Sequence, residues 1–210
     1  MMVRMQRRQL FAVPLLACLP VLAADARIYT RVDTELGAFV VAVDPAKAPI
    51  TVANYLAYVD ARQLDGGKVY RIVTPANQSA ETKHKIEVVQ WGRHQADDEQ
   101  APRPPIAHET TAMTGIKHRN GTVSMARLGP GTATAEFFIC IGDQPELDFG
   151  GRRNPDGQGF AAFGQVVAGD DVVMALHGKA QPEQFIKQPI AVRSVRRLSA
   201  QEAAALSLPR

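Results

Sequence analysis

Histidine is the side chain most often used to bind a metal or to transfer a proton near neutral pH, and the chain contains five. They are His84, His94, His108, His118 and His177. Neighbouring histidines lie at least ten positions apart, so none has the short spacing of paired metal ligands. Residues 108–112, with the sequence HETTA, begin like a zinc protease motif but lack its second histidine. We therefore expect no metal site.

Cysteine and serine also lack the surroundings that nucleophilic catalysis needs. Cys140 lies in the apolar sequence FFICIG, whereas a reactive thiolate needs exposure and nearby positive charge. The sequence contains no glycine-rich phosphate-binding loop and no Gly-x-Ser-x-Gly motif. It therefore predicts an inert, buried thiol, and it indicates neither a bound cofactor nor hydrolase chemistry.

The positive charge of the chain is concentrated at its N-terminus. Of the 24 lysines and arginines, Arg4, Arg7 and Arg8 lie in the first eight residues, and the first acidic residue is Asp25. Residues 25–210 therefore carry no net charge and give no electrostatic reason to expect nucleic acid or an anionic membrane as a partner. With 210 residues, 46% of them hydrophobic and 21% charged, the composition is typical of one globular domain.

Residues 1–24 have the three parts of an export signal. A basic start is followed by the apolar run 10–23, which is interrupted at Pro14, and then by small residues. The run is too short to span a bilayer comfortably, and no other segment of the sequence is apolar enough to cross a membrane. We therefore expect residues 1–24 to be a cleaved signal peptide and the mature protein to be periplasmic. A buried N-terminal helix is the alternative, which the prolines disfavour.

Two details of this signal stay open. Cleavage after Ala24 is our first expectation, with cleavage after Ala23 or Ala26 as alternatives. Residues 15–18, LLAC, weakly match a lipoprotein cleavage box, so a lipid anchor on Cys18 is the other interpretation. If Cys18 is removed with the signal, a single cysteine remains and no intramolecular disulfide can form.

The body of the chain alternates between short β-rich runs and turn sequences. Strands are expected at residues 28–34, 38–43, 68–73, 86–90, 122–126, 136–141, 160–167 and 190–198. Helices are expected at residues 46–62 and 170–177. Asp170 or Asp171 is expected to cap the second helix. Because strands and helices do not alternate regularly, we expect one antiparallel barrel or sandwich in residues 25–198, and a flexible tail in residues 199–210.

Three segments resemble the cyclophilin family of peptidyl-prolyl cis/trans isomerases: residues 69–73 (VYRIV), 124–127 (SMAR) and 135–139 (AEFFI). The order of elements around them is similar as well, and the resemblance covers residues 28–198. It looks most like the exported bacterial branch. The resemblance implies a mainly-β fold, a closed eight-stranded antiparallel barrel capped by two α-helices. It also implies a cofactor-free enzyme that accelerates X–Pro rotation in proline-containing, folding exported polypeptides. We expect this enzyme to be a monomer.

By this similarity, Arg71 matches the catalytic arginine of the family. Rotation about an X–Pro bond is hindered by delocalisation of the imide nitrogen lone pair, with a barrier of about 20 kcal/mol. A guanidinium group hydrogen-bonded to that nitrogen draws the lone pair out of conjugation, and this favours the twisted transition state. Arginine suits the role better than lysine because its charge is permanent and its donors form a rigid fork. An ordinary solvated strand arginine is the alternative.

The resemblance implies roles for further residues. Gln90 matches the glutamine that hydrogen-bonds the substrate carbonyl, and Phe138 matches the floor of the proline pocket. The remaining substrate-binding positions that it implies are Tyr70, Val88, Ala126, Arg127, Glu136, Leu147 and Phe160. At Ala126 and Arg127 the backbone is expected to hold the residues before proline. A buried glutamine of the barrel, and apolar side chains that only build the core, are the alternatives to these roles.

The sequence departs from the family in length and in charge. Arg71 and Gln90 are separated by more than twice the usual distance, which indicates an insertion at residues 74–85. Glutamates replace the residues usual at three positions near the groove: Glu87, Glu136 and Glu146. We expect them to create an acidic groove that favours Lys or Arg near proline, with ordinary solvated glutamates as the alternative. A scaffold that binds proline without turnover, or an unrelated β-barrel lectin or binding protein, remain rival functions.

Overall fold

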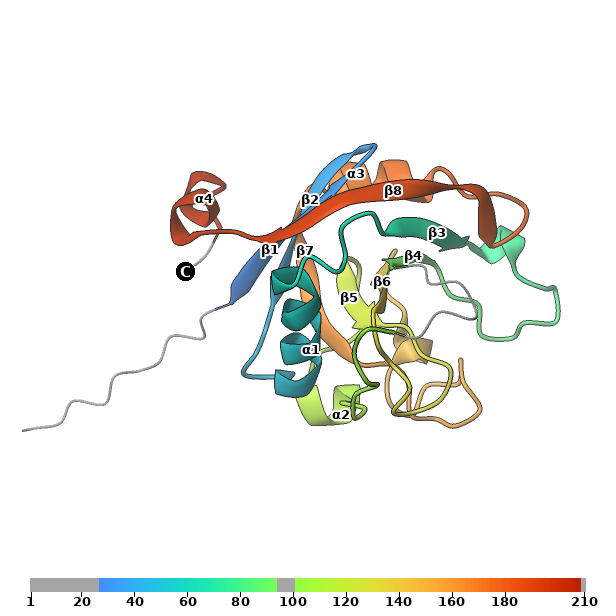
Figure 1. The fold of residues 1–210 in the computed structure, drawn as a ribbon. Helices are drawn as coiled ribbons and strands as arrows, with labels where there is room; N and C mark the ends of the chain where they lie inside the picture. The colour runs from blue at the N-terminus through green and yellow to red at the C-terminus, as the bar shows by residue number, and fades with distance from the viewer. Residues whose placement is uncertain (1–26, 94–100, 209–210) are drawn as a thin grey trace, which may run out of the picture.

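In the computed structural model, the described residues are 27–93 and 101–208. Eight antiparallel strands close into a barrel in the order β1-β2-β7-β5-β6-β4-β3-β8 (Figure 1). The strands are β1 (Ile28–Thr34), β2 (Gly37–Val43), β3 (Lys68–Val73), β4 (Val88–Gly92), β5 (Thr122–Met125), β6 (Glu136–Cys140), β7 (Ala162–Ala168) and β8 (Phe185–Arg197). The predicted mainly-β fold, a closed antiparallel barrel, is therefore confirmed. The predicted signal peptide and Cys18 lie outside the described residues.

Four α-helices and two short 3-10 helices accompany the barrel. They are α1 (Pro49–Asp60), α2 (Thr111–Thr114), α3 (Asp170–His177) and α4 (Ala200–Ala205), with η1 (Pro75–Asn77) and η2 (Pro145–Leu147). Figure 1 shows α1 below the long strand β8 and α3 above it, so the two expected helices lie on different sides of the barrel. None of the helices in residues 27–93 and 101–208 is long and apolar enough to cross a membrane.

Aromatic side chains fill the inside of the barrel. Trp91, Phe137 and Phe163 are each at most 1% exposed. Tyr55 of α1 reaches into this group, with ring centroids 5.2 Å from those of both Phe137 and Phe163. Burial of such large rings is among the strongest contributions to a core, so α1 is held against the barrel by the same cluster that fills it.

The start of α1 explains the histidine-glutamate pair that resembled part of a zinc protease motif. Glu109 is only 4% exposed. Its carboxylate accepts hydrogen bonds from the backbone N–H groups of Ile50 and Thr51, at 3.1 and 2.7 Å, and from the Thr51 hydroxyl at 2.6 Å. A helix N-terminus leaves backbone N–H groups unpaired and favours negative charge. Glu109 therefore works as a cap brought from a distant part of the chain.

One prediction about a helix end is wrong. The residue before α3 is Gly169, whose left-handed φ of 82° ends the preceding strand, and Asp170 and Asp171 lie in the first turn of the helix without capping it. Residues 199–208 of the predicted tail contain α4. Its capping box joins the Ser199 hydroxyl to the Glu202 N–H at 3.2 Å and the Ser199 N–H to the Glu202 carboxylate at 2.7 Å.

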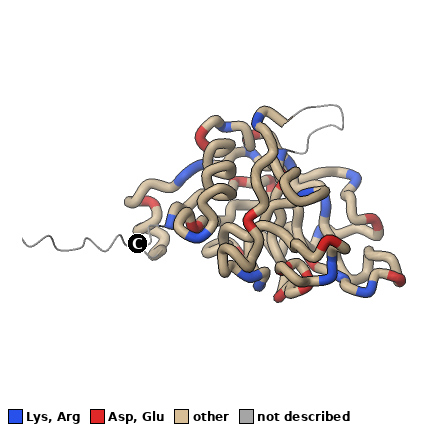
Figure 2. The backbone as a smooth tube through the Cα atoms, turned by 90° about the horizontal axis from the view of Figure 1, so that it is seen from below, with Lys and Arg blue, Asp and Glu red and all other residues tan. Residues whose placement is uncertain are grey.

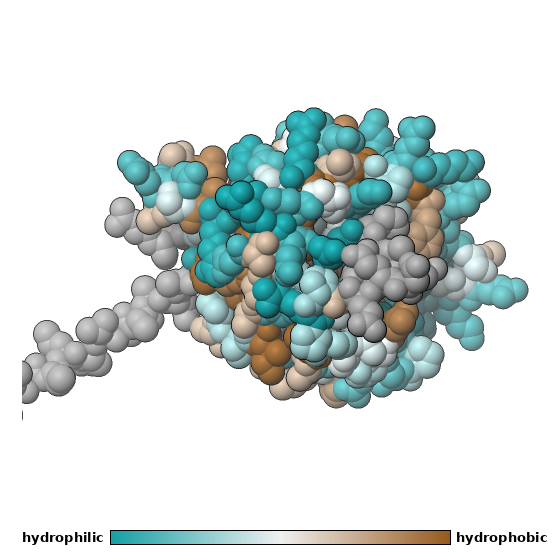
Figure 3. Space-filling model, viewed as in Figure 1, coloured by the Kyte–Doolittle hydropathy of each residue, from teal (hydrophilic) through white to brown (hydrophobic). Residues whose placement is uncertain are grey.

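The outside of the molecule carries both signs of charge. Figure 2 shows Lys and Arg interspersed with Asp and Glu along the described chain. Figure 3 shows a mainly hydrophilic face with small apolar patches between polar side chains. This mixture is consistent with the balanced charge counted for the body of the chain, and any strong local field must therefore come from a few particular groups.

A buried polar chain lies behind β6. His118 is 1% exposed, and its Nδ1 and Nε2 lie 2.9 Å from the Asp148 carboxylate and 2.9 Å from the Ser124 hydroxyl. Next to an ionised Asp148, Nδ1 donates and Nε2 accepts from Ser124, so neutral His118 satisfies both partners. The ring also stacks on Phe138, with centroids 5.9 Å apart. Ser124 is fully buried, so its hydroxyl cannot reach a substrate. This serine, histidine and aspartate therefore support Phe138 and do not form a catalytic triad.

Protonation of His118 should destabilise the fold. Burial lowers the pKa of His118 below its ordinary value, and this outweighs the hydrogen bond that His118 donates to Asp148, which raises the pKa. The unfolded chain therefore binds this proton more readily than the folded chain, so stability is fully present above about pH 6.5 and decreases below it. Denaturant unfolding at pH 7.5 and 5.5 should show a smaller loss in His118→Gln than in the natural sequence. Equal losses would exclude His118 as the titrating group.

Candidate active site

The register of the barrel aligns three side chains in one row. Arg71 of β3 lies opposite Gln90 of β4, and Gln90 lies opposite Phe138 of β6. Residues directly opposite each other on neighbouring strands point to the same face of a sheet. The alternate residues Val89 and Trp91 point into the core. The row therefore lies on the outer face of the barrel, where loops can build a site around it.

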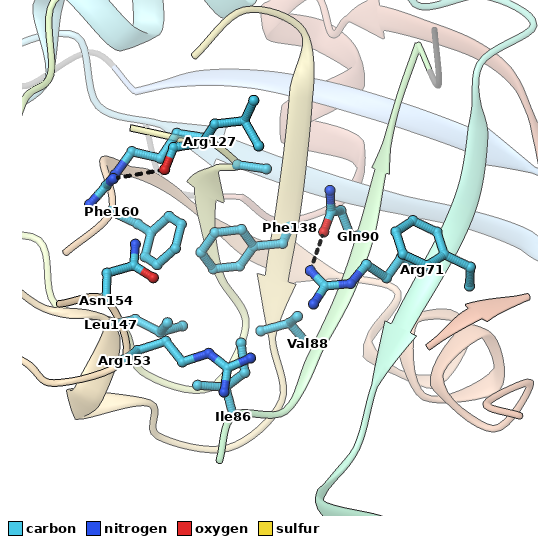
Figure 4. Close-up of a pocket in the computed structure, with 13 residues that line it drawn as sticks. Arg71, Ile86, Val88, Gln90, Arg127, Phe138, Leu147, Arg153, Asn154 and Phe160 are labelled. Atoms are coloured by element: carbon cyan, nitrogen blue, oxygen red, sulfur yellow. Dashed lines mark hydrogen bonds between the residues drawn. The ribbon is translucent and has the colours of Figure 1, made fainter. Parts of the chain in front are cut away.

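Those loops enclose a cavity of about 300 Å³ over the row (Figure 4). Its apolar wall is formed by Ile86, Val88, Phe138, Leu147 and Phe160. Its polar residues are Arg71, Gln90, Arg127, Arg153 and Asn154. The lining is completed by Ala126, Leu128 and Phe185. A small apolar pocket bordered by cations and amides is suited to a compact apolar ring flanked by peptide groups.

Phe138 forms the floor of the apolar wall. Its ring is 4% exposed and meets Phe160 edge to face, with centroids 5.4 Å apart and planes at 89°. Val88 and Leu147 pack with it in one buried cluster. Because His118 stacks behind the ring, Phe138 is fixed from both sides and presents a rigid surface to whatever enters the cavity.

Neutral oxygen atoms hold the Arg71 guanidinium group at the edge of this floor. Nη1 donates to Gln90 Oε1 at 2.9 Å, while Nε and Nη2 donate to Gln184 Oε1 at 3.1 and 2.5 Å. Phe185 lies beneath the cation, 5.7 Å from ring centroid to guanidinium carbon. Gln90 is itself fixed, because its Nε2 donates to the Tyr70 hydroxyl at 2.5 Å. Two amides and a ring thus orient Arg71 without cancelling its charge.

Arg71 remains a cation in this setting. Burial lowers the pKa of Arg71, and the nearby Arg153 lowers it further, but arginine stays protonated in proteins because its ordinary pKa is so high. Within residues 27–93 and 101–208, no carboxylate forms an ion pair with Arg71. Its positive charge is therefore available to a bound molecule.

Most of the residues that the sequence pointed to line the cavity. They are Arg71, Gln90, Phe138, Val88, Ala126, Arg127, Leu147 and Phe160. Tyr70 stands behind Gln90 and supports it from outside the cavity lining. Glu136 is also outside the lining and lies against Tyr70, whose pKa is raised by burial and by Glu136. The structure thus brings eight of the ten together and places the other two beside them.

Arg127 uses its side chain for structure. Its guanidinium is paired with Asp156 at 2.8 Å, donates to the Gly159 carbonyl, and covers the Phe160 ring at 5.0 Å. The side chain is only 1% exposed. It therefore secures the loop that carries Phe160, and its charge is already compensated.

The expected acidic groove is wrong, because none of its glutamates lines the cavity. Glu87 turns to His177, with 3.1 Å between carboxylate and Nε2. Glu146 forms an ion pair with Arg152 at 2.8 Å. Hydrogen bonds from the side chain and the backbone of Arg152 lower the pKa of Glu146 to about 2. Glu136 lies against Tyr70 as described above. The charges that do border the cavity are arginines.

Several residues of the site were missed from the sequence. Phe185 begins β8, five residues before the strand was expected to begin, and Gln184 directly precedes it. Arg153 and Asn154 lie in a loop that the sequence marked only as turns, and Ile86 follows the predicted insertion. Loops have no periodic pattern that would reveal their residues. The only indication in the sequence was the pair Gln184 and Phe185, which lies shortly before the expected strand 190–198.

The described residues give little support to thiol chemistry or to a metal site. Cys140 is buried, and burial raises the pKa of its thiol, which agrees with the inert cysteine predicted. Among the described residues, no three His, Cys, Asp or Glu side chains are grouped so that they could hold a metal ion.

Comparison with known proteins identifies the family. Residues 29–197 match the family model described as "Cyclophilin type peptidyl-prolyl cis-trans isomerase/CLD". Peptidyl-prolyl cis-trans isomerase cyp18 of Streptomyces antibioticus is 34% identical over 79% of this chain and 92% of that protein. Peptidyl-prolyl cis-trans isomerase A of Dickeya dadantii is 33% identical over 80% and 83%. Peptidyl-prolyl cis-trans isomerase B of Escherichia coli is 31% identical over 77% and 92%.

Solved structures show the same fold. A cyclophilin type peptidyl-prolyl cis-trans isomerase of Cryptosporidium parvum, crystallised in the presence of the dipeptide Ala-Pro, superposes with a TM-score of 0.65. It is 16% identical, and the match covers 81% of this chain and 99% of that one. With the family match and the bacterial relatives, the chain is therefore a member of the cyclophilin-type peptidyl-prolyl cis-trans isomerases.

Proposed function

We propose that the chain accelerates rotation about X–Pro bonds in exported polypeptides by placing the proline ring on Phe138 and its imide nitrogen beside Arg71. The observation that carries this proposal is the uncompensated Arg71 guanidinium at the edge of a rigid apolar cavity. The related structure obtained in the presence of Ala-Pro supports a proline-containing peptide as the occupant.

The geometry suits stabilisation of a twisted bond. As the bond rotates, the nitrogen lone pair localises and becomes a hydrogen-bond acceptor, which the planar ground state does not offer. A fixed N–H donor then binds the transition state more strongly than the substrate, and this difference lowers the barrier. Gln90 has a second Nε2 hydrogen for the substrate carbonyl, because the first is donated to Tyr70. The reaction needs no nucleophile and no proton transfer.

Replacement of Arg71 tests the proposal. Arg71→Ala should lower kcat/KM at least about tenfold, or roughly 1.4 kcal/mol of transition-state stabilisation, with little change in thermal stability. Arg71→Lys should restore little, because a point charge does not reproduce the fork. A protease-coupled assay on an Ala-Pro peptide measures both. Arg197→Ala is the control, since Arg197 pairs with Asp60 outside the cavity lining. Unchanged turnover in Arg71→Ala would remove Arg71 from the mechanism, and an inactive natural protein would favour the scaffold function.

Gln184 is a positioning residue for Arg71, and its replacement should affect the two kinetic constants differently. Gln184→Met keeps the bulk but removes the acceptor of Nε and Nη2, so we expect kcat to decrease about fivefold, as for a lost hydrogen bond of about 1 kcal/mol. KM should stay nearly constant, because Gln184 does not line the cavity. Gln184→Glu keeps the acceptor geometry but compensates the charge, so it should not restore full activity. A rise in KM alone would contradict the positioning role.

Export is the second part of the proposal. It is supported by the basic start, the apolar run and the small residues within residues 1–24. A monomer is supported by the closed barrel, which leaves no unpaired strand edge for another copy. The proposed mature enzyme works in the periplasm on proteins that fold there.

N-terminal sequencing of the protein recovered from the periplasm should find a start near Asp25. The small residues at positions 23, 24 and 26 set the range of expected cleavage sites. A chain that keeps Met1 would contradict export by a cleaved signal. A lipid attached to an N-terminal Cys18 would instead establish the lipoprotein alternative.

A further inference from the structure

The arginines around the cavity differ in how their charge is balanced. Arg127 is paired with Asp156 and Arg152 with Glu146, each at 2.8 Å. Arg153, next to Arg152 in sequence, forms no ion pair within the described part of the chain. Unlike Arg152, it lines the cavity. Two neighbouring arginines of one loop therefore differ. Arg152 is paired with a carboxylate outside the cavity lining, and Arg153 borders the cavity without such a partner.

The predicted insertion holds Arg153 in place. Its Nη1 donates to Gln78 Oε1 at 3.0 Å and to the His84 carbonyl at 3.1 Å. Gln78 is 6% exposed and is itself fixed by bonds to the Ile86 N–H and carbonyl, at 3.1 and 2.8 Å. Both acceptors of Arg153 are neutral. The insertion thus orients the guanidinium group and leaves its charge uncompensated.

Arg153 and Arg71 border the same cavity, with part of its apolar wall between them. Figure 4 shows Arg153 beside Ile86 and Leu147, Arg71 beside Gln90, and Val88 between the two arginines. The two positive charges repel each other. Burial lowers the pKa of Arg71, and the charge of Arg153 lowers it further. Two like charges at a partly buried site are costly, and an anion bound near them would relieve that cost. A neutral peptide would leave it in place.

We propose that Arg153 makes this isomerase prefer proline-containing segments that carry aspartate or glutamate directly next to the proline. The inference rests on the placement of the proline ring on Phe138 proposed above. The preference comes from a carboxylate of the substrate that lies near Arg153. The protein's own Glu87, Glu136 and Glu146 do not line the cavity, so they do not compete for this arginine. Lysine or arginine in the same place adds a third positive charge to the cavity and is disfavoured.

Two pairs of peptides test the preference. One pair has Glu or Gln immediately before proline, and the other has Glu or Gln immediately after it. Exchange spectroscopy by NMR measures cis/trans rates without a coupling protease. In at least one pair, kcat/KM for the Glu peptide should exceed that for the Gln peptide about fivefold at low salt. The ratio should approach one at 1 M salt, where the Debye length is about 3 Å. A ratio of one at low salt in both pairs would overturn the inference.

Matched variants assign the preference to one residue. Arg153→Gln should reduce the Glu-to-Gln ratio to about one, Arg153→Lys should keep part of it, and Arg152→Gln should keep all of it. Thermal unfolding of each variant checks that the fold is intact. A ratio that persists in Arg153→Gln would overturn the role of Arg153. If the natural protein accelerates neither the Glu nor the Gln peptides, the proposed function itself fails, which is distinct from turnover without a charge preference.

Discussion

Closure of the barrel in a single register is the constraint on which the site depends. Arg71, Gln90 and Phe138 come from three strands and become neighbours only because β3, β4 and β6 pair in this alignment. A slip of one residue would turn each side chain toward the core and replace it with a core residue such as Val89. The core aromatics prevent that slip, so packing inside the barrel fixes the chemistry outside it.

The second requirement is to orient a cation without neutralising it. Gln90 and Gln184 meet this requirement from opposite edges of β3, because β3 is paired on one side with β4 and on the other with β8. A carboxylate at either place would hold Arg71 more tightly but would compensate the charge that the transition state needs. Preorganised neutral dipoles give orientation at little electrostatic cost. Tyr70 and His118 extend this support one layer further, behind Gln90 and Phe138.

The sequence predicted the elements whose signals are local. The expected strands 28–34 and 68–73 match β1 and β3 in their bounds, because their apolar patterns lie within one segment. Contacts between distant segments left no such signal: Arg153 meets Gln78 across 75 positions, and Arg71 meets Gln184 across 113. Similarity placed the glutamates near the groove but could not give their direction, which depends on partners such as Arg152. The capping box of α4 was readable and was missed.

The insertion at residues 74–85 and the loop that carries Arg153 together give the cavity its charged side. They meet beside Phe138, where one supplies neutral acceptors and the other supplies the charge. Such a cavity discriminates through the free energy of desolvation as well as through attraction. An apolar side chain that covers Arg153 removes its water without forming a hydrogen bond in exchange. A carboxylate replaces that water with an ion pair. Discrimination between partners arises from such a difference, so a fold and an arginine shared by the family can serve a narrower set of sequences here.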